Sequence, residues 1–135
     1  MGYTLWIART KPRLVIEVDA DATLYDLHET LHAETNIGAM YFEGDGPDEG
    51  GWETEDPDEH NHAFWLGTRP WDRRAPSFWD PRNYEYEKQP GPPTDETKLA
   101  DLNLAKGDRI TYVYDYGHSR YCEFIVRETP TLVAA

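Results

Sequence analysis

The acidic residues of this chain are gathered in one long segment that contains no base. Between Arg13 and Arg69 there is not a single Lys or Arg, whereas fifteen Asp and Glu lie from Glu17 to Glu59. Unpaired carboxylates are too costly to bury, so this segment has to keep them in water. We therefore expect it to decorate a folded body whose interior is mainly aromatic and aliphatic.

This segment also accounts for the net charge of −13, because the other 80 residues hold 11 acids and 13 bases. An acidic surface repels phosphate backbones and anionic lipid, which makes nucleic acid and membranes unfavourable partners. It favours metal cations or a basic protein partner. Four Lys against nine Arg, with acids twice as numerous as bases, is equally typical of adaptation to salt, so both explanations stay open.

Length and composition predict one folded domain over residues 1–135. A chain of this size buries roughly two thirds of the surface that its unfolded form exposes. Five Trp and nine Tyr are too many aromatic residues for a disordered chain. Cys122 is the only cysteine, which excludes an internal disulfide and fits a cytoplasmic setting. The residues after Met1 predict a strand, and neither export nor membrane insertion; the oligomeric state stays open.

The start of the chain predicts a strand hairpin followed by a helix. Two apolar-rich runs, 3–9 and 13–18, are separated by a turn at Pro12. From Thr23 the apolar spacing changes from two to near 3.6 residues, and Thr23 with Asp26 forms a capping box. The apolar stripe of this helix consists of Leu24, Leu27 and Leu31, and we expect the helix to run to about Glu34.

The remainder predicts further strands around two irregular segments. An acidic loop over about 43–59 follows a short strand at 40–42, and a segment rich in Pro and aromatic residues covers about 70–93. Further elements are expected at 62–66, 109–114 and 121–128 as strands, and at 98–104 as one or two helical turns. This order predicts an α+β fold: a single domain with a mainly antiparallel sheet, one principal helix packed on one face, and a C-terminal hairpin.

Several short motifs follow the hairpin and the capped helix in a definite order. They are His60-Asn61-His62-Ala63-Phe64, Lys98-Leu99-Ala100-Asp101-Leu102, Gly107-Asp108 and Tyr112-Val113-Tyr114-Asp115-Tyr116-Gly117. In this order they resemble the plasmid pRiA ORF-three-like family over nearly the whole chain. The resemblance implies a compact α+β domain, associated with plasmids and mobile elements, without a settled activity. After Gly117 the chain departs from the acidic, aromatic and His continuation of that family, so a site built there is altered or absent.

Some members of that family carry resolvase-like names. Recombinases need a nucleophilic Ser or Tyr set among Arg residues and a basic DNA-binding face. The sequence shows no such arrangement, so we do not expect this activity.

Alternate residues near position 60 could form a metal site. On an extended strand, Asp58, His60 and His62 would point to one side at intervals of about 7 Å. Two imidazoles with a nearby carboxylate suit zinc or another divalent ion. Pro57 and the loop character of the segment favour instead a solvated acidic loop that enters the sheet. We expect no cofactor, and keep a divalent metal at these residues as the alternative.

A second group of candidate binding residues, Asp115, Tyr116 and His118, surrounds the expected C-terminal hairpin turn. A carboxylate beside an imidazole could form an acid-base pair, and Gly117 would allow a positive φ. Asp at a turn more often bonds its own backbone, and neither a nucleophile nor an orienting group is identifiable here. The structural interpretation is therefore favoured.

The third group interleaves aromatic rings with guanidinium groups, as at Trp65, Arg69, Trp71 and Tyr84. Such an arrangement stacks on single-stranded bases or on a peptide. Nearby acids, among them Asp72 and Asp80 and also Glu85 and Glu87, offset much of the basic charge. Protein contact is therefore favoured over nucleic acid.

Two further features are interpreted as structural. His28 and His32 lie four residues apart beside the Leu stripe, which predicts the edge of the packed helix face rather than a shared ligand. Cys122 lies in an expected strand and is predicted to be buried and inert. Taken together, the sequence predicts a non-catalytic protein-interaction or accessory module, with a metal-dependent enzyme or metal-binding protein as the alternative and single-strand binding as the third.

Overall fold

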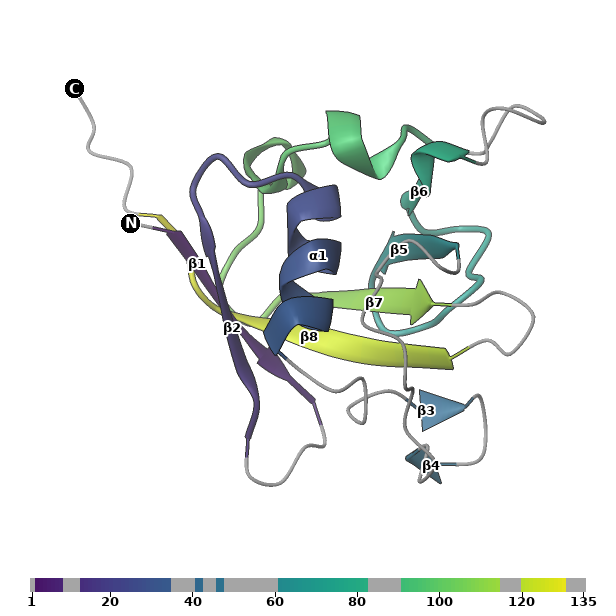
Figure 1. Ribbon diagram of the computed structural model, residues 1–135, viewed down its shortest axis with the longest axis horizontal. Helices are drawn as coiled ribbons and strands as arrows, with labels where there is room; N and C mark the ends of the chain where they lie inside the picture. Colours follow the sequence, from purple (N-terminus) through teal and green to yellow (C-terminus); the bar gives the residue numbers. More distant parts are fainter. Residues whose placement is uncertain are drawn as a thin grey trace.

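The protein is an antiparallel sheet with an α-helix packed on one face, as the computed structural model in Figure 1 shows. The structure describes residues 2–8, 13–34, 41–42, 46–47, 61–82, 91–114 and 120–130. The main sheet runs in the order β2 (Val15–Asp19), β1 (Gly2–Ile7), β8 (Arg120–Glu128), β7 (Arg109–Tyr114), β5 (His62–Leu66) and β6 (Ser77–Trp79). This architecture confirms the predicted α+β fold.

The nine-residue strand β8 organises the sheet. On one side it forms the predicted C-terminal hairpin with β7, in a register from Arg109 opposite Ile125 to Tyr114 opposite Arg120. On the other side it pairs with β1 and, nearer its start, with β3 (Tyr41–Phe42), which in turn pairs with β4 (Gly46–Pro47). Because β8 is this long, two separate segments of the chain can share its edge.

The N-terminal strands and the helix follow the sequence prediction closely. Strands β1 and β2 pair antiparallel, while the turn predicted between them lies outside the described residues. The helix α1 (Leu24–Glu34) starts at the predicted capping box. Thr23 Oγ1 accepts a hydrogen bond from the Asp26 backbone N–H (3.0 Å), and Asp26 Oδ2 accepts one from the Thr23 backbone N–H (2.9 Å). These two bonds satisfy backbone donors that the first helical turn would otherwise leave open.

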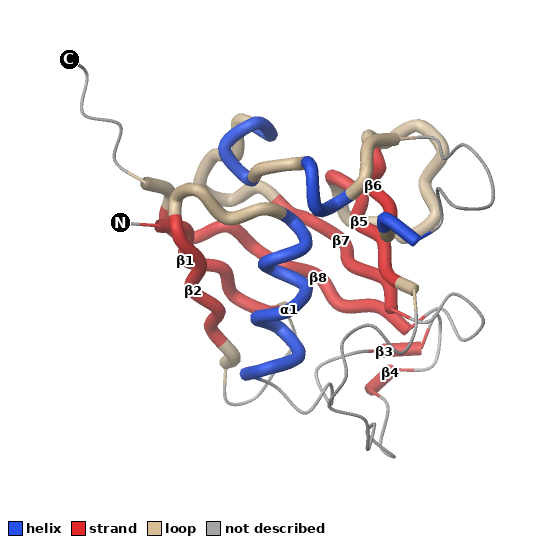
Figure 2. The backbone as a smooth tube through the Cα atoms, turned by 45° about the horizontal axis from the view of Figure 1, so that its top comes forward, coloured by secondary structure: helices blue, strands red, loops and turns tan. Residues whose placement is uncertain are grey.

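Strand alternation separates the side chains of the sheet onto two faces. Figure 2 shows α1 lying across the strands of the sheet. The sheet face that α1 covers carries the main core. All three leucines of the predicted stripe are fully buried there, together with Cys122 as expected. The opposite face carries a smaller cluster, in which Ala63, Trp65 and Val113 are buried and Trp71, Ala75, Trp79 and Tyr121 pack around them. Alternation along β5 and β7 thus supplies residues to both layers.

The structure also contains short elements that the sequence did not predict. Strand β6 lies inside the segment 70–93, which was expected to be irregular, and β4 lies inside the predicted acidic loop 43–59. The predicted helical turns are the 3-10 helix η3 (Leu99–Leu102), preceded by a second one, η2 (Thr94–Glu96). Elements of two to four residues carry too little periodicity to be recognised without their partners.

Strand β6 is held on both sides. It pairs with β5, while the Trp79 backbone N–H donates to the Pro92 carbonyl on its other side (3.1 Å). Gly91 lies so close to this strand that a Cβ atom there would come within 1.8 Å of the Ser77 carbonyl oxygen. Prolines at positions 76 and 81 disfavour a strand in this part of the chain, so contacts with β5 and with residues 91–92 determine that β6 forms.

Among the described residues, no helix is long and apolar enough to span a membrane.

Replacement of Thr23 by Ala tests the contribution of the capping box. We expect the free energy of unfolding to fall by about 1 kcal/mol, because the Asp26 backbone N–H loses its acceptor. Urea denaturation measures this loss. Thr23→Ser keeps the hydroxyl and should retain most of the stability; equal losses in both variants would show that the methyl group, and not the cap, matters.

Candidate functional site

Three tryptophans meet on the sheet face opposite α1. Trp65 comes from β5, Trp79 from β6, and Trp71 from the loop that connects these strands. The ring centroids of Trp65 lie 5.0 Å from Trp71 and 5.4 Å from Trp79, and both pairs meet edge to face. Trp65 is buried, whereas the other two rings are half-buried. The half-buried rings therefore present aromatic surface to the outside.

Backbone contacts hold the connecting loop against the sheet. The Leu66 N–H donates to the Pro76 carbonyl (3.0 Å) and the Gly67 N–H to the Arg109 carbonyl (2.9 Å). Thr111 Oγ1 donates to the Gly67 carbonyl (2.8 Å). Gly67 has a φ of 132°, a value that glycine adopts readily. The loop is thus anchored at both ends, which pre-organises the tryptophan that it carries.

Trp71 itself has a φ of 60°, in the left-handed region. A bulky residue in this conformation is strained by about 1–2 kcal/mol relative to the right-handed region. Ring packing on Trp65 and Trp79 offsets that cost. A strained backbone that holds a partly exposed ring in place is a common feature of binding sites.

The three rings line a pocket of about 450 Å³, which we call the tryptophan pocket. Its remaining lining residues are Asp72, Arg73, Ala75, Pro76 and Ser77. Trp79 Nε1 donates to Ser77 Oγ (3.0 Å), which fixes the orientation of the indole. The pocket combines apolar walls with a few polar groups at its rim, the composition expected for a binding site.

A second hollow of about 470 Å³ adjoins it, and we call this the arginine hollow. It is lined by Arg69, Pro70, Trp71, Asp72, Arg73 and Arg74. Trp71, Asp72 and Arg73 line both spaces, so one loop forms part of the wall of each hollow. Asp72 Oδ1 accepts a hydrogen bond from the Arg74 backbone N–H (2.9 Å). The sequence-predicted residues Trp65, Arg69 and Trp71 are therefore brought together here.

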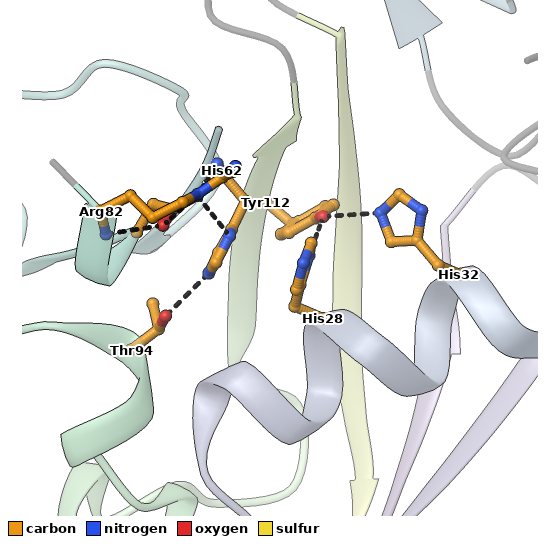
Figure 3. Close-up of polar contacts among 7 residues, drawn as sticks. His28, His32, His62, Arg82, Thr94 and Tyr112 are labelled. Carbon is orange, nitrogen blue, oxygen red and sulfur yellow. Dashed lines mark hydrogen bonds and ion pairs between the residues drawn. The ribbon is translucent and has the colours of Figure 1, made fainter. Parts of the chain in front are cut away.

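A histidine cluster is buried on the other face of the same strands, and Figure 3 shows its contacts. His28 and His32 project from α1 toward Tyr112 of β7. The Tyr112 hydroxyl lies 2.5 Å from His28 Nδ1 and 3.0 Å from His32 Nε2. One hydroxyl proton can serve only one imidazole, so the other ring has to donate to the phenolic oxygen. The tautomers of His28 and His32 are therefore linked through Tyr112.

His62 of β5 completes this cluster. Its ring stacks on that of His28, with centroids 3.8 Å apart and planes 13° from parallel. His62 Nε2 lies 2.7 Å from Thr94 Oγ1, and Nδ1 lies 3.3 Å from Asp80 Oδ2. Asp80 is also bridged by Arg82, whose Nη2 lies 2.8 Å from Oδ2. These contacts tie α1, the sheet and the start of η2 into one polar network.

Burial and neighbouring charges displace the titration of this network. Burial lowers the pKa of the His28 imidazole far below its ordinary value, and the His62 and His32 rings act in the same direction. For Asp80, burial alone would raise the pKa of the carboxyl, but the hydrogen bonds from His62 and Arg82 outweigh it and lower that pKa well below its usual range. At neutral pH the interior thus holds a neutral His28 and an ionised Asp80.

The cluster corrects the expectation for His28 and His32. They lie at the centre of the packed helix face rather than at its edge, with both side chains buried. A signal for this was present, because His28 follows Leu24 by four residues and precedes Leu31 by three, at the spacing of the buried stripe. Likewise His62 shares strand parity with buried Phe64. The roles of Asp80 and Thr94 had no such local signal.

Residues 28–32 also read His-Glu-Thr-Leu-His, the H-E-x-x-H pattern of zinc metalloproteases, which sequence reasoning had missed. In that chemistry the Glu acts beside the metal as a general base. Here Glu29 is exposed, whereas the two imidazoles turn inward to the Tyr112 hydroxyl. Within the described ranges, no three His, Cys, Asp or Glu side chains are arranged to hold a metal ion.

Several sequence-predicted site residues lie outside the described residues. These are His60 and Asp58 of the metal group, Asp115, Tyr116 and His118 of the hairpin turn, and Tyr84 of the aromatic group. His62, the described member of the metal group, contacts Thr94 and Asp80 in the buried network. The metal site as a whole stays a prediction.

Acidic pH should destabilise the fold through His28. Its pKa is lowered in the folded state from about 6.5 in the unfolded chain, so below pH 6.5 the unfolded chain binds one more proton. The contribution of His28 to the free energy of unfolding is therefore fully present above that pH. Below it, this free energy decreases by about 1.4 kcal/mol per pH unit because of this residue. We expect His28→Asn to lose this component, so that urea unfolding curves of the two proteins converge between pH 6 and about pH 4.5. Parallel pH dependences would contradict a neutral, buried His28.

Replacement of Tyr112 by Phe removes the hydroxyl shared by the two helix histidines. We expect a loss of about 1–3 kcal/mol in the free energy of unfolding, because buried imidazole nitrogens lose a hydrogen-bonding partner. Denaturation of Tyr112→Phe, His32→Leu and the double variant measures the coupling. Strictly additive losses would mean that the Tyr112–His32 contact contributes nothing to stability.

Comparison with known proteins supports the fold and goes no further. No family model matches the chain, and no curated protein matches it. Among solved structures, it is similar to the crystal structure of MM3350, a protein of unknown function from Methanosarcina mazei Go1, with a TM-score of 0.55 and 19% sequence identity. The similarity covers 99% of this chain and 63% of that chain. The chain therefore shares its fold with a longer protein of unknown function.

Proposed function

We propose that this protein is a non-catalytic binding module that captures a protein partner at the tryptophan pocket. One observation carries the proposal: the half-buried rings of Trp71, which has a strained backbone in the connecting loop, and of Trp79 on β6 pack against the buried Trp65. Tryptophan is enriched among residues that dominate binding energy at protein interfaces. Rings that are already fixed lose little conformational entropy when a partner arrives, which favours affinity.

The buried histidine network supports binding rather than catalysis. Asp80, His62 and Thr94 lie in the order of a catalytic triad, with a hydroxyl at Nε2 and a carboxylate at Nδ1 of one imidazole. A nucleophile must reach its substrate, however, and both Thr94 and His62 are fully buried. In this position the network links β5, β6 and η2, and so supports the strands that carry Trp65 and Trp79.

The net charge of the protein indicates which surface charge a partner would carry. The net charge of −13 favours a partner whose surface is basic overall. On the described surface, Glu17, Asp19, Asp21 and Asp26 line a hollow between β2 and α1, which extends the acidic character. Membership of the plasmid pRiA ORF-three-like family and a cytoplasmic location stay predictions that agree with this proposal.

Selection from a library of random displayed peptides tests the proposed function without assuming a partner. We expect peptides selected on the wild type to bind the Trp71→Gly variant about tenfold or more weakly, because the anchor ring is missing. Glycine accepts the left-handed backbone, so this variant should fold normally, which thermal melting checks.

The matched control is Trp6→Ala. Trp6 lies on β1, where the guanidinium groups of Arg13 and Arg127 stack on its ring at 4.7 and 4.0 Å from the centroid. It is thus a partly exposed tryptophan with arginine neighbours outside the pocket, and its loss should leave peptide binding unchanged. If selection yields no binders, or only binders indifferent to Trp71→Gly, the proposal is wrong.

A further inference from the structure

We infer that the tryptophan pocket and the arginine hollow together take an acidic peptide segment in which Asp or Glu adjoins a bulky apolar residue. This inference rests on the proposed function and names the chemistry of the segment that is captured. The apolar residue enters the tryptophan pocket. The neighbouring carboxylate meets the guanidinium groups of the arginine hollow.

The two hollows have the arrangement that such a segment requires. Trp71, Asp72 and Arg73 line both of them, so a ligand residue in one lies beside a ligand residue in the other. The tryptophan pocket offers three indole rings, while the adjoining hollow offers three guanidinium groups. Neighbouring side chains of one peptide can therefore satisfy both spaces at once.

The arginines of this hollow have no acidic partner among the described residues. Arg69, Arg73 and Arg74 are exposed, and in the part of the chain that the structure describes none of them forms an ion pair. Arg82 and Arg109, by contrast, pair with Asp80 and Glu123. Acids outnumber bases two to one in this chain. Three arginines in one hollow, without an acidic partner among the described residues, therefore make a locally positive surface that favours binding of an anion.

Asp72, the carboxylate that lines this hollow, does not form an ion pair with these arginines among the described contacts. Asp72 accepts the Arg74 backbone N–H and thereby shapes the turn. Guanidinium groups bind carboxylates with paired, charge-assisted hydrogen bonds. A carboxylate that belongs to the partner is therefore the complementary group for this hollow.

A peptide fits this surface better than a nucleic acid strand does. Rings and guanidinium groups also suit nucleotides, but a strand carries a phosphate at every residue and would extend from the hollow over a protein of charge −13. A short peptide places one or two carboxylates at the arginines and need not extend further. Salt screens interactions between exposed charges over about 8–10 Å, so the arginines of the hollow determine which side chains bind there. The acidic surface elsewhere on the protein acts on the rest of the partner and orients it.

Short fluorescent peptides test this inference by anisotropy with the full chain. One peptide carries Glu on both sides of a Leu-Trp pair, and in the other two Gln or Lys replaces each Glu. We expect the Glu peptide to bind about tenfold more tightly than the Gln peptide, and the Lys peptide to bind most weakly. Arg69→Gln and Arg74→Gln, which change residues that line the arginine hollow but not the tryptophan pocket, should each weaken binding of the Glu peptide more than binding of the Gln peptide. Lys106→Gln, which removes one exposed charge outside both hollows, is the matched control.

The outcomes separate this inference from the proposed function. If the Gln or Lys peptide binds as tightly as the Glu peptide, and Trp71→Gly still weakens all three, the acidic-segment inference fails and the binding module stands. If no peptide responds to Trp71→Gly, both fail. Labelled oligothymidine serves as the nucleic acid probe: tighter binding than the Glu peptide, with a steep decrease as salt rises, would overturn the inference in favour of single-strand binding.

Discussion

Burial of one face of α1 against the sheet positions every other feature of this protein. Three leucines supply the apolar contact, and His28 occupies the gap between them on the same face. Tyr112 meets this face from β7, so the helix is joined to the sheet by hydrophobic packing and by a hydrogen-bonded centre. The hydrogen bonds at this centre offset part of the cost of burying polar groups, since an unsatisfied buried donor or acceptor costs about 1–3 kcal/mol.

That polar centre also connects the helix face of the sheet to the face that carries the tryptophan pocket. His62 and Trp65 belong to the same strand but point to opposite sides. Asp80 directly follows Trp79, so the ionised carboxylate that bridges His62 and Arg82 lies next to the last strand residue of the pocket. The buried network therefore gives the tryptophan pocket a rigid support, which a site needs if its rings are to meet a partner without reorganisation.

The charge pattern of the molecule is divided in the same way. The acidic segment explains the net charge and the hollow between β2 and α1. The loop 67–76 instead concentrates exposed arginines around Trp71, and these form no ion pair with any described residue. A protein partner with a basic body and an acidic apolar segment would match both regions, and the opposed charges would orient it. Neither region has the extended basic surface on which nucleic acid binding usually depends.

The sequence by itself determined the elements whose signals are local. The capping box and leucine spacing located α1, and the apolar alternation located β5, β7 and β8, because both signals come from residues within one helix or strand. The grouping of Trp65, Arg69 and Trp71 was also visible, since one short connection carries all three. Only the tertiary structure decided that His28 stacks on His62, that Thr94 and Asp80 bind that imidazole, and that β6 is a strand. These depend on contacts between residues far apart in the chain, where burial and hydrogen-bond satisfaction outweigh local preference.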